Sequence, residues 1–305
     1  MPLYQEIMQK EDYVKAGRIA GEVREIVRKT DWTGKSVYDI CEWVEGEIIK
    51  RGAKCAFPVN ASINEIAAHY TAEPDDPITI KDTDLVKIDL GAQINGYIAD
   101  TAVTVCYDAE FDRLVDTAET ALGSAMSMIK TGVNASDVGR EIEATIKQMG
   151  FKPIANLSGH SLEQYTIHAG RTIPNIWSVG GFSLSADSAY ACEPFVTTSD
   201  GGGFVRNGKI KNIFALNSRK KTKNADADDL LDYIWEEFNM LPFALRWLTK
   251  KWETQKAREL LEHLVRKKAV QAYPILVEVT EKRVAQAEHT FIPQDDGVLV
   301  TTTGN

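Results

Sequence analysis

Two aspartates, Asp89 and Asp100, lie eleven positions apart in a stretch whose pattern brings their carboxylates together. Between them are Asn95 and Gly96, a pair that favours a two-residue type I′ turn between antiparallel strands. A turn centred on this pair places Asp100 opposite Gly91. Asp89 and Asp100 are then diagonal neighbours on one face of the hairpin, with Cα atoms roughly 7–8 Å apart. At this separation the two carboxylates can converge on a shared cation.

The apolar residues around Asp89 decide what this proximity implies. Val86, Ile88 and Leu90 predict a strand that is at least half buried, and burying two neighbouring carboxylates is costly unless a positive charge compensates them. A pair of divalent metal ions is a suitable compensation, because such ions accept oxygen ligands. The alternative is that both aspartates point to solvent from an exposed hairpin face, and the hairpin alone leaves both interpretations open.

Two of the five histidines, His160 and His168, fall in one short segment. They are eight residues apart and bracketed by glycine and polar residues, so they are poor candidates for packing in a core. A single histidine of this kind is more often a structural residue than a ligand. Together with the paired aspartates, the two histidines favour a metal site.

The elements that must position these residues alternate between helical and strand periodicity. Helices are predicted at 9–29, 36–51, 112–130 and 135–149, strands at 85–91 and 97–107, short strands in an irregular Gly-rich stretch up to 205, helical periodicity over 225–273, and strands over 274–303. This mixture predicts one α+β domain over residues 1–305, with 226–273 as a helical insertion.

Composition limits the class of protein. The chain has 305 residues, of which 44% are hydrophobic, and it contains neither a signal-like start nor a run of about 18 apolar residues. The net charge of −9 opposes a general affinity for nucleic acid or anionic membrane. The four cysteines form no Cys-x-x-Cys pair, so reduced packing residues are expected. We therefore predict a cytoplasmic protein that binds neither nucleic acid nor membrane.

Six segments of the chain, in order, resemble the motifs of the type II methionine aminopeptidases. They are Ala56-Phe57-Pro58 with Ala67-Ala68-His69-Tyr70, the hairpin from Lys87 to Ala102, Asn156-Leu157-Ser158-Gly159-His160-Ser161, Ile167-His168-Ala169-Gly170, Tyr190-Ala191-Cys192-Glu193-Pro194-Phe195, and Ala287-Glu288-His289-Thr290. The resemblance extends from about residue 56 to residue 290. It is to the short, archaeal-style form, which has no long N-terminal extension.

The resemblance implies a pita-bread fold, in which two related halves enclose a metal cleft, with a helical insertion before the last ligand strand. It also implies two divalent ions (Co, Mn, Fe or Zn) about 3.5–4 Å apart, with a water or hydroxide between them that attacks the scissile carbonyl. Asp89 is the expected ligand of one ion, His160 and Glu193 of the other, and Asp100 and Glu288 bridge both.

The resemblance further implies roles for residues around the ions. Glu193 is expected to pass a proton to the leaving amine as well as bind metal. His69 is expected near the scissile bond and the substrate's first residue, unless it is structural. His168 is expected to hydrogen-bond the peptide and stabilise charge in the transition state, with the same structural alternative. Phe57, Ile167 and Tyr273 are the predicted wall of the methionine pocket, although each could equally belong to the core.

The predicted activity is removal of the initiator methionine from nascent polypeptides with a small second residue, at or near the ribosome, by a monomeric enzyme. One alternative is an Xaa-Pro dipeptidase with the same fold. Another is a non-catalytic relative that binds RNA or the ribosome. The segment 167–170 and the insertion favour the aminopeptidase over the dipeptidase. The complete set of five ligands and the pI near 5.2 disfavour the RNA-binding relative.

Overall fold

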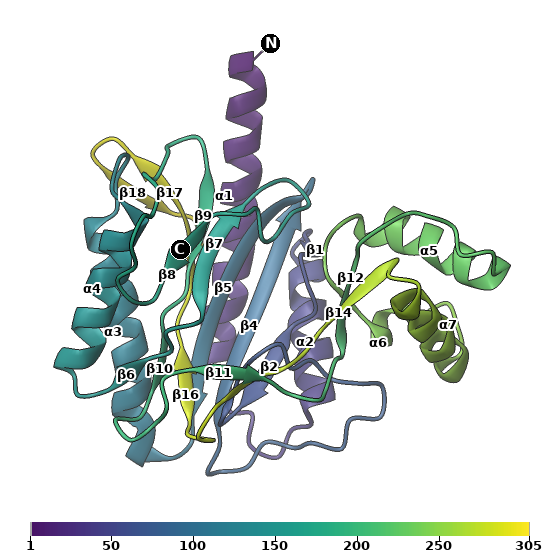
Figure 1. The fold of residues 1–305 in the computed structure, drawn as a ribbon, viewed down its shortest axis with the longest axis horizontal. Helices are drawn as coiled ribbons and strands as arrows, with labels where there is room; N and C mark the ends of the chain where they lie inside the picture. The colour runs from purple at the N-terminus through teal and green to yellow at the C-terminus, as the bar shows by residue number, and fades with distance from the viewer. Residues whose placement is uncertain (1, 305) are drawn as a thin grey trace.

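The structure is a computed structural model that describes residues 2–304, with side chains described from Gln9 onward (Figure 1). The helices are α1 Pro2–Lys29, α2 Val37–Lys50, α3 Asp112–Met128, α4 Ala135–Gln148, α5 Ala225–Phe238, α6 Leu245–Leu248 and α7 Thr254–Arg266, with a 3₁₀ turn at Ala109–Phe111. Helices α1 to α4 flank a central group of strands, and α5 to α7 form a lobe at one side (Figure 1).

The strands form small antiparallel sheets. They are β1 Lys54–Cys55, β2 Asn60–Ile63, β3 Ile66–Ala68, β4 Leu85–Ile94, β5 Tyr97–Cys106, β6 Lys152–Pro153, β7 Ser158–Leu162, β8 Thr172–Pro174, β9 Ala189–Cys192, β10 Phe195–Thr197, β11 Val205–Asn207, β12 Ile213–Leu216, β13 Phe243–Ala244, β14 Val270–Tyr273, β15 Leu276–Glu278, β16 Val284–Gln286, β17 His289–Gln294 and β18 Gly297–Val300. Strand β4 pairs with β1, β2 and β5, and the largest sheet has the order β18-β17-β9-β7-β8. Three further sheets have the orders β16-β10-β6, β11-β15-β3 and β13-β12-β14.

The hairpin of β4 and β5 has the predicted register. Gly91 opposes Asp100, and Asp89 opposes Ala102. Asn95 and Gly96 have φ angles of 52° and 86°, as a type I′ turn requires. The prediction made from the two turn residues is therefore confirmed.

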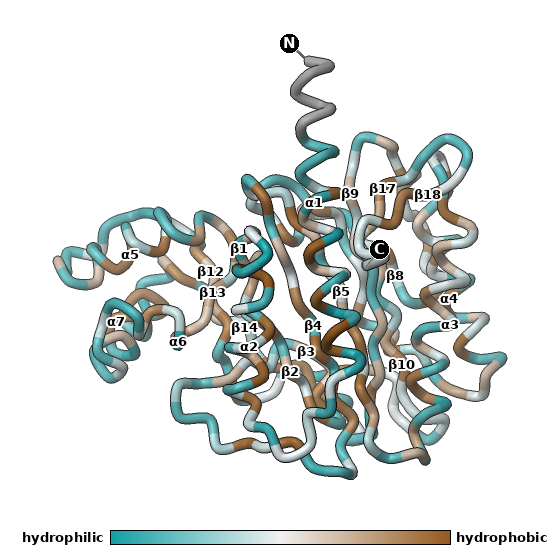
Figure 2. The backbone as a smooth tube through the Cα atoms, turned by 180° about the vertical axis from the view of Figure 1, so that it is seen from behind, coloured by the Kyte–Doolittle hydropathy of each residue, from teal (hydrophilic) through white to brown (hydrophobic). Residues whose placement is uncertain are grey.

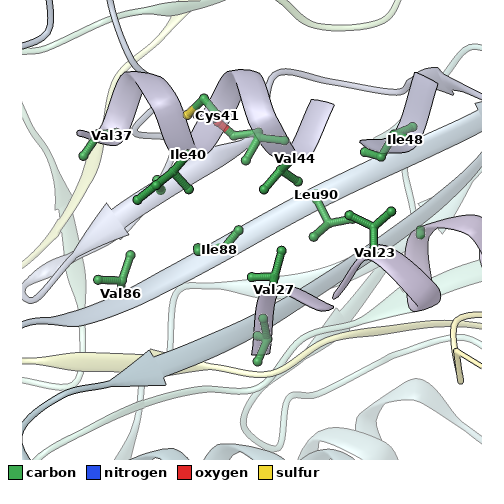
Figure 3. Close-up of a cluster of buried hydrophobic side chains, with 14 of the residues drawn as sticks. Val23, Val27, Val37, Ile40, Cys41, Val44, Ile48, Val86, Ile88 and Leu90 are labelled. Carbon is green, nitrogen blue, oxygen red and sulfur yellow. Dashed lines mark hydrogen bonds between the residues drawn. The ribbon is translucent and has the colours of Figure 1, made fainter. Parts of the chain in front are cut away.

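Helices α1 and α2 bury one face of this hairpin. Val23 and Val27 of α1 and Ile40 and Val44 of α2 close on Ile88 of β4, and all five side chains are fully buried (Figure 3). Ser36 caps the start of α2, because its hydroxyl accepts a hydrogen bond from the Asp39 amide. Since side chains alternate along a strand, Asp89 and Gly91 project from the opposite face of β4.

A second core packs α3 and α4 against the other strands. Leu114 of α3 and Ile142 of α4 share this core with Tyr190 of β9 and Phe291 of β17, whose rings stack with centroids 5.6 Å apart. The structure therefore has two helix-covered halves, with β5, β9 and β17 between them. Figure 2 shows the apolar segments concentrated along the central strands and hydrophilic loops along one rim.

The lobe of α5 to α7 has a core of its own, which includes Leu230, Ile234, Leu260 and Leu264. Helical periodicity was predicted across 225–273, but β13 and β14 lie within this range and pair with β12. The buried Arg246 of α6 attaches the lobe to α2 through ion pairs with Glu42 and Glu45. Within residues 2–304, no helix is both long enough and apolar enough to cross a membrane.

Candidate metal centre

Strand pairing brings together the five predicted metal ligands, which lie on five different segments. Asp89 is on β4, Asp100 on β5 and His160 on β7; Glu193 directly follows β9, and Glu288 lies between β16 and β17. Strand β9 pairs with both β7 and β17, which places the last three ligands side by side. Glu288 forms an isolated β-bridge to Ala102 of β5, and this bridge joins the two groups.

All the predicted site residues line one cavity of about 350 Å³. They are the expected ligands Asp89, Asp100, His160, Glu193 and Glu288, the histidines His69 and His168, and the apolar candidates Phe57, Ile167 and Tyr273. The segments that carry them span more than 200 positions of the chain, from 57 to 288. The hypothesis that the hairpin aspartates face solvent is therefore wrong for Asp100, whose exposure is 3%, and both aspartates face the cavity.

Donor atoms in this cavity have the spacing of ligands around a cation. One donor atom each from Asp100, His160 and Glu288 lie within 4.8 Å of one another. His160 Nε2 is 3.6 Å from Asp100 Oδ2 and 3.5 Å from Glu193 Oε1, which is too long for a good hydrogen bond. Donors about 2.1 Å from one ion at tetrahedral angles stand roughly 3.4 Å apart. The residues present therefore fit a bound metal.

Unpartnered polar atoms point to the same conclusion. Asp89 Oδ1, Asp100 Oδ1 and Glu288 Oε1 are buried and accept no hydrogen bond from the described residues. Buried polar atoms without partners are rare in native proteins and call for an explanation such as a bound ion. A divalent cation with these oxygens as ligands supplies one.

Burial shifts the titration of the ligands toward their uncharged forms. It raises the pKa of Asp89 to about 7 and raises the pKa of Asp100 well above its usual range, where Asp89 and Glu193 add like-charge repulsion. The pKa of Glu288 is raised for the same reasons. Burial lowers the pKa of His160 to about 3, so its imidazole is neutral and able to bind metal.

Hydrogen bonds behind the ligands restrict their movement. The Gln286 side-chain amide donates to Glu193 Oε2 and to Glu288 Oε2, at 3.4 Å in both cases. Thr290 Oγ1 accepts from the Asp100 amide at 2.7 Å and donates to the Asp100 carbonyl at 2.8 Å. Groups that orient metal ligands in this way typically raise metal affinity.

His69 and His168 line the cavity at different places. The His69 ring lies 3.2 Å from the Pro274 carbonyl through Nδ1, so Nδ1 carries the proton and Nε2 has a free lone pair. Burial lowers the pKa of His69 to about 4, and its φ of 67° is unusual for a residue with a side chain. His168 is more exposed, and its ring is edge-on to that of His160 with centroids 4.5 Å apart.

The apolar wall contains the predicted residues and several that were missed. Gly91 leaves room for the Phe57 ring, because a Cβ atom at Gly91 would lie 2.2 Å from Phe57 Cε1. Tyr273 packs edge-on against His69, with ring centroids 5.9 Å apart. The missed lining residues include Asn60, Phe195, Ile213, Pro242 and Leu276. Asn60 is a buried polar residue that pairs with Asp89 in the sheet, and no local signal in the sequence predicts this pairing.

Sequence comparison identifies relatives of this chain. Residues 11–212 match the model of metallopeptidase family M24. The methionine aminopeptidase of Saccharolobus solfataricus is 42% identical over 290 residues, which cover 94% of this chain and 95% of the relative. The methionine aminopeptidase of Pyrococcus abyssi is 43% identical over 296 residues, which cover 97% of this chain and 100% of the relative.

Solved structures share the fold at lower identity. The methionine aminopeptidase of Thermotoga maritima superimposes with a TM-score of 0.69 at 23% identity, covering 96% of this chain and 95% of that one. A thermophilic Arx1 superimposes with a TM-score of 0.78 at 18% identity, and the match covers 95% of this chain and 90% of the Arx1 chain. The prolidase of Pyrococcus furiosus superimposes with a TM-score of 0.62 at 17% identity, and the match covers 97% of this chain and 64% of the prolidase. These likenesses confirm the predicted pita-bread fold. From the family match and the extent of its identity to the archaeal sequences, the chain belongs to the methionine aminopeptidases of metallopeptidase family M24.

Proposed function

We propose that this chain removes the initiator methionine from polypeptides whose second residue is small. The observation that carries the proposal is the single cavity in which five ligand residues, two histidines and an apolar wall meet. Two divalent ions would be held by Asp89, Asp100, His160, Glu193 and Glu288. Cobalt, manganese, iron and zinc all suit these carboxylate and imidazole ligands.

When bound, such ions supply Lewis acidity, which polarises the scissile carbonyl and makes water more acidic. The protein's own groups then position the substrate and move protons. Glu193 lies beside His160 at the cavity surface, where a carboxylate can accept a proton and return it to the leaving amine. His69 is neutral, and its free Nε2 can accept a hydrogen bond from the peptide. His168 lines the same cavity, and its proposed role is to donate a hydrogen bond to the peptide near the scissile bond.

The methionine side chain would occupy the apolar part of the cavity, against Phe57, Ile167 and Tyr273. A thioether is flexible and polarisable, so aromatic and aliphatic walls suit it. The proposal includes one catalytic domain over residues 1–305 with 226–273 as its helical insertion. Helices α5 to α7 support this, and the β12-β14 strands of the lobe supply Ile213 and Tyr273 to the cavity.

The proposed substrates are nascent polypeptide N-termini, reached by a monomer in the cytoplasm at or near the ribosome. The net charge of −9 supports a peptide rather than a nucleic acid as the ligand. We expect a small second residue because the two histidines and the ligand carboxylates line the same cavity and limit the room beside the metal site.

The test is release of free methionine from Met-Ala-Ser by the metal-reconstituted protein, with Met-Leu-Ser and Gly-Pro as comparison substrates and EDTA as a control. EDTA-sensitive cleavage of Met-Ala-Ser alone supports the proposal. Cleavage of Gly-Pro would indicate a prolidase, and inactivity on all three would favour a binding protein. Glu288→Gln is the matched inactive variant, since it keeps the size of the side chain and removes a ligand charge.

A further inference from the structure

Two of the expected metal ligands, Asp100 and Glu288, belong to segments of different sheets. Strand β5 belongs to the sheet of β4, whereas Glu288 immediately precedes β17 of the largest sheet. In the described part of the chain, a single β-bridge joins β5 to the segment of Glu288. In this bridge the Glu288 amide donates to the Ala102 carbonyl at 3.3 Å, which is near the upper limit for such a bond. Side-chain hydrogen bonds therefore supply most of the connection: Thr290 Oγ1 of β17 bonds to the Asp100 backbone, and a second set of bonds lies behind the cavity.

Arg24 of α1 lies at this junction, behind the cavity. Its side chain is only 4% exposed, and Nη1 donates to Thr101 Oγ1 at 2.8 Å and to His289 Nδ1 at 2.8 Å. Thr101 directly follows Asp100 in the sequence, and His289 directly follows Glu288. Because side chains alternate along a strand, each points away from the cavity and toward α1. A single guanidinium therefore bonds to both strands next to both ligands.

The contact continues from Thr101 to the ligand backbone. Thr101 Oγ1 donates to the Glu288 carbonyl at 2.7 Å, so Arg24, Thr101 and Glu288 form one chain of hydrogen bonds. His289, the second acceptor of Arg24, has a further partner: Thr302 Oγ1 contacts His289 Nδ1 at 2.8 Å and accepts a hydrogen bond from the Thr290 amide at 3.1 Å. An arginine donor to Nδ1 requires that this nitrogen carry no proton, which fixes the neutral tautomer of His289.

We propose that Arg24 is a positioning residue that sets the separation of Asp100 and Glu288, and thereby the affinity for the second metal ion. The inference rests on the proposed metal site. The geometry of a guanidinium suits this role, because Glu25 holds the Nε and Nη2 edge of the rigid plane, and this fixes the directions in which the two N–H bonds of Nη1 meet their acceptors. Glu25, which accepts from Arg24 Nε and Nη2, keeps the buried charge paired.

The experiment compares Arg24→Met, which keeps an unbranched apolar stem and removes the guanidinium, with Arg28→Ala as the control. Arg28 lies one turn later on α1 and pairs with Glu25 and Glu119, so its loss changes the charge of the same helix without touching Thr101 or His289. Metal-free proteins are titrated with Mn²⁺ by calorimetry, folding is checked by circular dichroism, and kcat and KM are measured on Met-Ala-Ser at saturating Mn²⁺.

We expect Arg24→Met to weaken the second Mn²⁺ binding step by about tenfold or more, as loss of groups that orient ligands does elsewhere. At saturating Mn²⁺ its KM should stay within about twofold of the wild-type value while kcat falls. Arg28→Ala should bind both ions like the wild type. Unchanged Mn²⁺ affinity in a folded Arg24→Met protein would overturn the inference.

Thr101→Val provides a second variant in case Arg24→Met does not fold. It removes the hydroxyl that links Arg24 to the Glu288 carbonyl and keeps the shape of the side chain, so it should weaken the same Mn²⁺ step; wild-type affinity in this variant would also overturn the inference. A wild-type protein that binds Mn²⁺ but cleaves no methionyl peptide would overturn the proposed function alone. The role of Arg24 would then still be decided by the Mn²⁺ titrations.

Discussion

The fit between Gly91 and the Phe57 ring gives a sharp test of the proposed methionine pocket. In Gly91→Ala the new Cβ would lie 2.2 Å from Phe57 Cε1, about 1.2 Å short of ordinary contact, and 2.9 Å from Cζ. The ring must therefore retreat by roughly 1 Å, either into the space that methionine should occupy or away from it. Overpacking of this kind costs about 1–3 kcal/mol of folding free energy. Loss of fit in an apolar pocket by about one methylene is worth about 1–3 kcal/mol of substrate binding, or roughly ten- to two-hundredfold.

We expect Gly91→Ala to lower kcat/KM for Met-Ala-Ser by roughly ten- to a hundredfold, mostly through KM, and to lower Tm by several degrees. Its Mn²⁺ stoichiometry should not change, because the methyl group meets the ring and not a ligand. Gly123→Ala is the control. A Cβ at Gly123, in the middle of α3, meets nothing within 4 Å, so that variant should be at least as stable as the wild type.

A double substitution separates the ring from other effects of the alanine. Phe57→Leu removes part of the ring that the new methyl group meets, so Gly91→Ala should cost less stability in the Phe57→Leu protein than in the wild type. The difference is the coupling energy of the pair. If Gly91→Ala matches the wild type in both Tm and KM, the Phe57 ring does not form a rigid wall of the pocket, and the assignment of Phe57 to the methionine pocket fails.

Three further predictions concern the metal and the histidines. Asp100→Asn should lose both Mn²⁺ binding in calorimetry and peptide cleavage, and a fully active variant would contradict the two-metal hypothesis. His69→Ala should keep its metal content by atomic absorption yet lose most turnover, whereas loss of metal would show that His69 is a ligand or structural. Burial raises the pKa of Asp89 to about 7 from an ordinary value near 4, so the metal-free fold favours the protonated acid and should lose stability as the pH rises. The buried neutral His160 has the opposite effect, so the contribution of Asp89 is measured as the difference in Tm between the wild type and Asp89→Asn, both without metal. That difference should fall between about pH 4 and 7, and a pH-independent difference would refute the reasoning.

The features that could be predicted from sequence are those set by local chemistry. Asn95 and Gly96 determine the turn, and the turn determines which residues face each other across the hairpin, so the convergence of Asp89 and Asp100 followed from four positions. Helix α2 was predicted over 36–51 from its amphipathic pattern, which is a local property of the sequence. These inferences need no knowledge of the rest of the chain.

The features that could not be predicted depend on distant contacts. Strand β12 pairs with β13 across about 30 positions and with β14 across more than 50. Much of the chain between them has helical periodicity, so nothing local marks Ile213 or Pro242 as cavity residues. The ligand roles of His160, Glu193 and Glu288 came from family resemblance rather than from spacing. Arg24 resembled any other charged residue on an amphipathic helix, because its partners lie 77 and 265 positions away.

The alternation of side chains along a strand explains why the ligand segments have the composition they do. On β5, Asp100 faces the cavity and Thr101 faces α1; at the start of β17, Glu288 faces the cavity and His289 faces α1. A metal ligand placed on a strand must therefore be followed by a residue that suits the opposite face. Here that residue, Thr101 or His289, bonds to the buried guanidinium of Arg24. The carboxylates repel one another in the cavity while the polar side chains behind them tie their strands together. Substitutions on the hidden face should thus alter the metal site without touching a ligand, in contrast to substitutions of exposed residues on α1, such as Lys15, which face solvent.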